Sequence, residues 1–124
     1  MTDGVRRAQR AEALRDLIEL RVPVKQAATA LAQYPWDSDE ELDVLTRADA
    51  LRLLSRYKRQ ELTPVEVQHW AEALEGRDDL GLEHMSEDLL KEFLFQIATP
   101  ELADRLTPEV ATRWEATLKE SPQG

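Results

Sequence analysis

Apolar residues recur along this chain at intervals of three and four, the spacing that places side chains on one face of an α-helix. Two stripes have complete i, i+3, i+4, i+7 spacing, one running from Ala50 to Tyr57 and one from Leu90 to Ile97. The apolar composition points the same way, because 19 Leu and 15 Ala stand against 7 Val and 2 Ile, and β-branched residues favour strands. We therefore predict an all-α fold.

Signals for helix starts and stops divide the chain into a compact bundle of five to six short helices. In Thr63-Pro64-Val65-Glu66 the threonine is an N-cap, the proline occupies the first helical position and the glutamate completes a capping box. Gly76 follows where a left-handed C-terminal cap is expected, and Thr107-Pro108 repeats the start signal. The helices are predicted at residues 5–20, 24–33, 46–60, 63–74, 86–97 and 107–118.

The 124 residues are predicted to form one domain, with frayed ends at residues 1–4 and 121–124 and a main loop at residues 77–85. Residues 62–74 and 106–118 share the spacing of a Leu-Thr-Pro start, a tryptophan and a leucine. This similarity fits either a duplication or two independent uses of one capping chemistry. Residues 1–45 either pack on the rest of the chain or form a separable arm.

The most acidic run lies at residues 37–43, where Asp37 or Ser38 is expected to cap a short helical turn whose acids suit the positive end of the helix dipole. A calcium-binding EF-hand loop starting at Asp37 requires glycine at its sixth position and glutamate at its twelfth, but the chain has Leu42 and Ala48 there. It also has no cysteine, no glycine-rich phosphate loop and no nucleophile elbow. We therefore expect no metal, no cofactor and no enzyme activity.

Charge narrows the class of partner. The net charge is −9, and from Glu61 onward fifteen acids stand against five bases. Such a surface repels phosphates and attracts basic proteins, so nucleic acid is disfavoured as a partner. The stripe Arg52, Arg56 and Arg59 is expected to pair with carboxylates of the acidic C-terminal half rather than with nucleic acid.

No apolar run approaches the roughly 20 residues needed to span a bilayer. The N-terminal residues lead into no apolar signal-peptide segment. We expect no membrane partner and a cytoplasmic location.

The segment from Arg77 to Glu83, with the helix start that follows it, is the predicted partner-binding surface. Leucines framed by carboxylates on a loop form a plausible docking surface for a basic protein. The predicted contact residues are Asp78, Asp79, Leu80, Leu82, Glu83, Glu87 and Asp88. The alternative is that Leu80 and Leu82 fold inward and the acids only face water.

Two functions from different classes follow. The first is a non-catalytic protein-binding module, of immunity or inhibitor type, that acts on a basic partner. The second is a structural or regulatory protein that works as a homo-oligomer through an apolar helix face involving Trp36 and Trp114.

Several pieces of the chain match a known pattern: Tyr57, the Leu62-Thr63 cap, Trp70-Ala71, and the segments EGRDDLG at 75–81 and ATPEL at 98–102. Through them residues 46–106 resemble an uncharacterised bacterial family of small acidic all-helical proteins, a resemblance that implies no biochemical role. In size, charge and helicity the chain is also similar to immunity proteins of the colicin D type, small acidic bundles that block the basic active site of a nuclease toxin. This second similarity implies an inhibitor of a basic protein.

Overall fold

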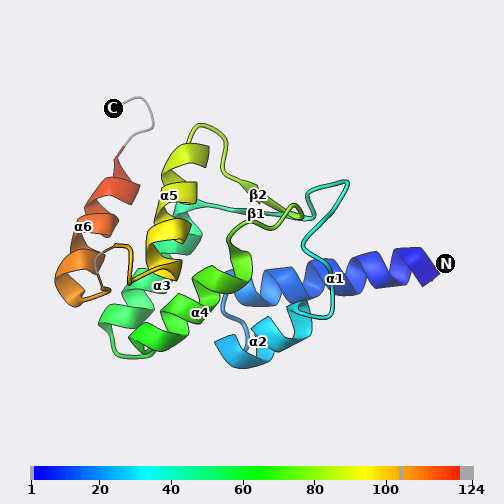
Figure 1. Cartoon of the computed structure of the whole chain (residues 1–124), viewed down its shortest axis with the longest axis horizontal. Helices are drawn as coiled ribbons and strands as arrows, with labels where there is room; N and C mark the ends of the chain where they lie inside the picture. Colours follow the sequence, from blue (N-terminus) through cyan, green and yellow to red (C-terminus); the bar gives the residue numbers. More distant parts are fainter. Residues whose placement is uncertain (1, 104, 121–124) are drawn as a thin grey trace.

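A computed structural model describes residues 2–103 and 105–120 (Figure 1). Its elements, in chain order, are α1 (Thr2–Ile18), α2 (Val24–Leu31), β1 (Asp43–Leu45), α3 (Arg47–Lys58), α4 (Pro64–Leu74), β2 (Leu80–Leu82), α5 (Glu87–Ala98) and α6 (Pro108–Lys119). Six helices and one pair of three-residue strands make up this part of the chain. The prediction of an all-α bundle is confirmed.

The predicted capping signals act as expected. Thr63 Oγ1 accepts a hydrogen bond from Glu66 N at 3.1 Å, and Glu66 Oε1 accepts one from Thr63 N at 2.8 Å, so the capping box is complete. At α6, Thr107 Oγ1 accepts a hydrogen bond from Val110 N at 3.2 Å, but a valine side chain cannot close the box. The similarity of residues 62–74 and 106–118 thus includes a shared cap. Gly76 has the left-handed backbone expected after α4, with φ +84°.

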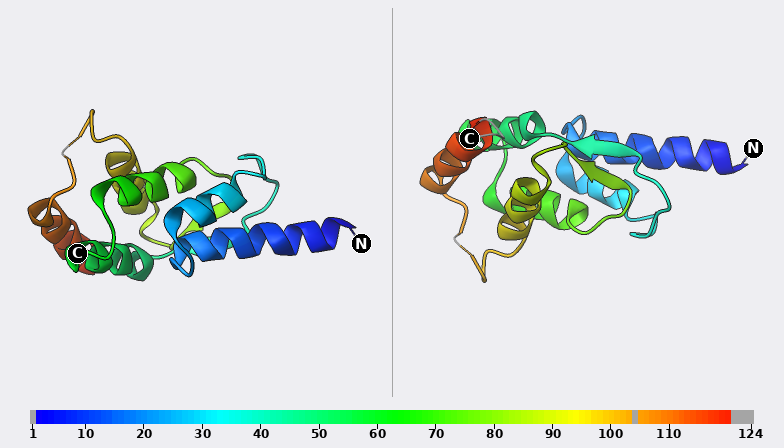
Figure 2. Two further views of the ribbon diagram at one scale, coloured as in Figure 1. Left: turned by 90° about the horizontal axis from the view of Figure 1, so that it is seen from below. Right: turned by 90° about the horizontal axis from the view of Figure 1, so that it is seen from above.

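The core is centred on Trp70 of α4, which is fully buried. Its indole Nε1 donates a hydrogen bond of 2.9 Å to the carbonyl of Leu17 in α1. The ring packs edge-on against Phe93 of α5 at 6.4 Å, and Phe93 packs edge-on against Trp114 of α6 at 5.1 Å. Because α1 and α2 also pack against each other and α2 against α4, these first two helices belong to the same core rather than to a separable arm (Figure 2).

The predicted helical turn at residues 39–43 is wrong. Residues 37–42 are extended or bent, and β1 pairs with β2 in parallel, Val44 lying opposite Gly81. The pairing is extended by hydrogen bonds from Leu42 N to Asp79 O at 2.7 Å and from Glu83 N to Leu45 O at 2.9 Å. Acids near a helix start stabilise the helix by only about 0.3–1 kcal/mol. In this segment the backbone groups form hydrogen bonds with the β2 segment instead of closing a helical turn.

The predicted loop at residues 77–85 therefore contains a strand. Several helix limits also differ from prediction by a few residues, and Thr2 to Gly4 form the first turn of α1. The predicted fraying of residues 1 and 121–124 lies outside the described residues. Within the described part of the chain, no helix combines the length and apolar character needed to cross a membrane.

Candidate functional site

The structure removes two residues from the predicted partner-binding surface. Asp79 is 0% exposed and Leu80 is 8% exposed, so neither side chain is available to a partner. Leu82 is half-buried against the core. The leucines of this segment face inward because β2 packs against the helices. For Leu80 and Leu82 the structure therefore agrees with the alternative prediction, in which both side chains fold inward.

Asp79 is the centre of a buried ionic cluster. Its carboxylate accepts hydrogen bonds from Arg77 Nε at 2.9 Å and Arg77 Nη2 at 3.1 Å, and from Arg10 Nε at 2.9 Å. Burial alone raises the pKa of this carboxyl, but the hydrogen bonds and positive charges of Arg77 and Arg10 outweigh it. The pKa of Asp79 therefore lies below its ordinary value.

The same two arginines hold the loop that follows α2. Arg10 Nη2 donates to the carbonyls of Pro35 and Asp37, each at 2.9 Å, and Arg77 Nη2 donates to the carbonyl of Pro35 at 3.0 Å. The cluster thus joins α1, the loop and the segment after α4. The role of this cluster is structural. The predicted partner contact at Asp79 is wrong, and the sequence does not show the reason because Arg10 lies 69 residues from Asp79.

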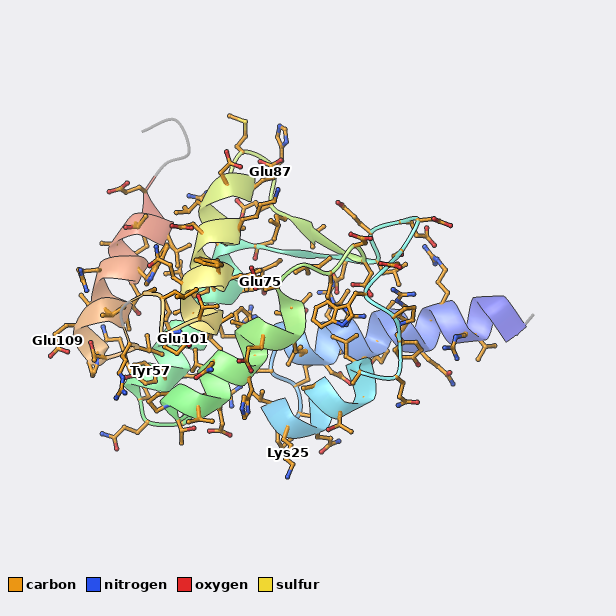
Figure 3. The ribbon with its side chains drawn as sticks, in the orientation of Figure 1. Lys25, Tyr57, Glu75, Glu87, Glu101 and Glu109 are labelled. Atoms are coloured by element: carbon orange, nitrogen blue, oxygen red, sulfur yellow. The ribbon has the colours of Figure 1, made fainter. Side chains whose placement is uncertain are left out.

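The remaining predicted residues lie in three places, at the two ends of β2 and at the start of α5. Glu83 lies at the far end of β2, where it accepts hydrogen bonds from Arg47 N at 2.8 Å and Arg47 Nε at 3.3 Å. Glu87 and Asp88 are exposed at the start of α5, and Figure 3 shows Glu87 beside that first turn. The pKa of Glu87 is lowered, first by its own backbone N–H at the helix start and further by His84. The negative charges of Glu87 and Asp88 stabilise α5, because they lie at the positive, N-terminal end of its helix dipole.

Asp78 lies at the opposite end of β2 and has a different neighbour. Its backbone N–H donates a hydrogen bond of 3.0 Å to the carbonyl of Trp36. The Trp36 side chain is 46% exposed, and the guanidinium of Arg77 lies 4.9 Å from its ring centroid. This cation–π contact with a buried arginine orients a large aromatic ring at the surface.

Exposed carboxylates follow Trp36 along the chain. We define the acidic surface as residues 36–41 together with Asp78. The side chains of Asp37, Asp39, Glu41 and Asp78 are exposed and form no ion pair with the described residues. Glu40 pairs with Arg7 Nε at 2.5 Å, and this hydrogen bond, with the arginine charge, lowers the pKa of Glu40. The acidic run was visible in the sequence, but its nearness to Asp78 depends on tertiary structure.

The arginine stripe on α3 is neutralised locally. Arg52 pairs with Asp49 at 2.9 Å, while Arg56 and Arg59 pair with Glu61 at 3.1 and 3.0 Å. Pairing with carboxylates is confirmed, although only Glu61 belongs to the acidic half named in the prediction. In residues 2–103 and 105–120, no group of three or more His, Cys, Asp or Glu side chains is arranged to hold a metal ion.

Comparison with protein-family models, with curated proteins and with solved structures gives no match. The resemblances to a bacterial family and to immunity proteins stay predictions.

Proposed function

We propose that this protein is a non-catalytic protein-binding module, of the immunity or inhibitor type, that takes a basic protein partner on the acidic surface. The observation that supports the proposal is the exposed Trp36, followed along the chain by exposed Asp37, Asp39 and Glu41 and joined by Asp78. None of these four carboxylates forms an ion pair with the described residues. Unlike Asp79 or Glu83, these groups lose no existing ion pair when a cationic side chain approaches.

The two kinds of group contribute differently to binding. Tryptophan is one of the residue types that supply most of the energy at protein interfaces, and Trp36 is held in place by Arg77 beneath its ring. The carboxylates of Asp37, Asp39 and Asp78 supply charge complementarity, which raises the association rate and penalises acidic competitors. The net charge of −9 adds long-range attraction for a basic partner that weakens as salt is added.

Affinity capture from a lysate of the native cell tests this proposal when charge-reversed variants are run beside the wild type. The surface variant is Asp37→Lys/Asp39→Lys/Glu41→Lys. We expect the wild type to retain a basic protein at low salt and to release it at moderate salt. The surface variant should retain at least about tenfold less, because three favourable charges become repulsive.

The control variant Glu92→Lys/Glu101→Lys/Glu109→Lys changes the net charge by the same amount at exposed carboxylates elsewhere. Figure 3 shows Glu101 and Glu109 toward the α6 side of the molecule, far from the projecting end of α1. The control should keep most of the captured partner. Equal loss in both variants means that only net charge matters, and equal retention in both means that the acidic surface is not the contact; either result contradicts the proposal.

A homo-oligomer is the second candidate, but the predicted helix face is wrong, because Trp36 lies in the loop after α2 and the half-buried Trp114 packs edge-on against Phe93. A groove of about 360 Å³ lies between the start of α4 and the chain after α5, with Ile97, Pro100 and Leu106 in its wall and Val65 56% exposed beside Pro64. Gln68, Gln96 and Arg105 also line this groove. Exposed apolar side chains with a polar rim are a common feature of protein–protein contacts. Light scattering across a hundredfold range of concentration distinguishes the candidates, because a constant monomer mass rules out this second function.

A further inference from the structure

The N-terminal end of α1 is attached to the molecule in an unusual way. Every residue from Gly4 to Gln9 is exposed, and the first buried apolar residue of α1 is Ala13. Figures 1 and 2 show this end of the helix extending beyond the other elements. Apolar packing therefore fixes the second half of α1 but not residues 4–10.

Contacts of three arginines hold residues 4–10 instead, and their partners lie in the acidic surface or just before it in the chain. Arg7 forms its ion pair with Glu40, with more than half of each side chain exposed. The guanidinium of Arg6 lies 5.2 Å from the ring centroid of Tyr34. Arg10 donates to the carbonyl of Asp37 at 2.9 Å. The three arginines line a groove of about 590 Å³ whose other wall is residues 37–40 and 42.

We propose that residues 4–10 are an autoinhibitory arm, whose Arg7 occupies Glu40 of the acidic surface, with Arg6 beside it over the Tyr34 ring, until a basic partner displaces both arginines. The arm presents to Glu40 the same guanidinium chemistry that the partner would bring, so the two compete for one acceptor. This inference rests on the proposed function and adds its regulation.

The strengths of the contacts divide the arm into a movable and a fixed part. The Arg7–Glu40 pair is exposed to water on both sides, and pairs of this kind are weak and exchange readily. Arg10 is only 15% exposed and bonds to the fully buried Asp79, so it stays in place. Displacement then involves Arg6 and Arg7 and leaves the folded core unchanged.

Binding of a fluorescently labelled nona-arginine peptide, measured by anisotropy, tests the arm on the full chain. The arm variant is Arg6→Ala/Arg7→Ala. Its matched control is Lys25→Ala/Lys91→Ala, which makes the same change in net charge at exposed lysines that form no ion pair with the described residues. Lys25 lies on α2 (Figure 3).

We expect the arm variant to bind the peptide about two- to fivefold more tightly than the control variant, the range that release of one exposed ion pair allows. Equal affinities in the two variants overturn the proposal, because the gain would then come from net charge alone. A weaker affinity in the arm variant overturns it too, since the arginines would then support the surface rather than block it.

The surface variant Asp37→Lys/Asp39→Lys/Glu41→Lys separates failure of the arm from failure of the proposed function. If it binds the peptide as well as the wild type does, the acidic surface is not the binding site and the arm has nothing to block. If it loses binding while the arm variant and its control bind alike, the surface stands and only the autoinhibitory arm is wrong.

Discussion

Replacing Asp79 by asparagine keeps the shape of the side chain but removes its charge from between two arginines. Removing one partner of a buried ion pair typically destabilises a protein by about 3–5 kcal/mol, because the other charge is left uncompensated. Here Arg77 keeps its bond to the Pro35 carbonyl and its contact with the Trp36 ring, and Arg10 keeps its two carbonyl acceptors. We therefore expect the lower end of the range, about 3 kcal/mol.

Urea unfolding at pH 7, followed by circular dichroism at a helical wavelength, measures this change. The neighbouring substitution Asp78→Asn is a matched control, because that side chain is exposed and has no ion pair with the described residues. It should change the free energy of unfolding by no more than about 0.5 kcal/mol. If Asp79→Asn costs under about 1 kcal/mol, the ionic cluster does not hold the loop in place.

The pH dependence gives an independent check with a definite sign. The pKa of Asp79 is lower in the folded protein than in the unfolded chain, where an aspartate titrates near about 3.9. Its ionised form therefore stabilises the fold above that value, and the stabilisation is lost as pH falls through the folded pKa. The stability difference between wild type and Asp79→Asn should be largest at neutral pH and shrink in acid. A difference that stays constant down to strongly acidic pH contradicts the assignment.

Two further predictions concern the core and its turns. Gly76→Ala should destabilise the protein by about 1 kcal/mol, because a Cβ is disfavoured at φ +84°, and no loss in thermal unfolding would contradict this. Trp70→Phe should cost about 2–3 kcal/mol through the lost hydrogen bond to the Leu17 carbonyl and the cavity left by the smaller ring. Urea unfolding measures this loss of stability. A cost below about 1 kcal/mol would show that the hydrogen bond from Trp70 to the Leu17 carbonyl does not stabilise the packing of α1.

Features that depend on near neighbours in the chain are predictable from the amino-acid sequence. The starts of α3, α4 and α6 follow from the N-caps Thr46, Thr63 and Thr107, whose side chains act over three residues, and the left-handed Gly76 follows from the end of α4. The apolar stripe from Leu90 to Ile97 likewise determined which face of α5 is buried. All of these are local, so a single sequence is enough.

Tertiary structure alone decided the pairing of residues far apart in the chain. The three-residue strands β1 and β2 are too short to show an alternating pattern, and their pairing depends on the packing of α1 and α5 around them. Asp78 and Asp79 are adjacent acids that look alike in sequence, yet one is exposed and the other fully buried. Arg10 makes that difference, because it reaches Asp79 only after α1 has packed, and a buried carboxylate is tolerated only where its charge is compensated.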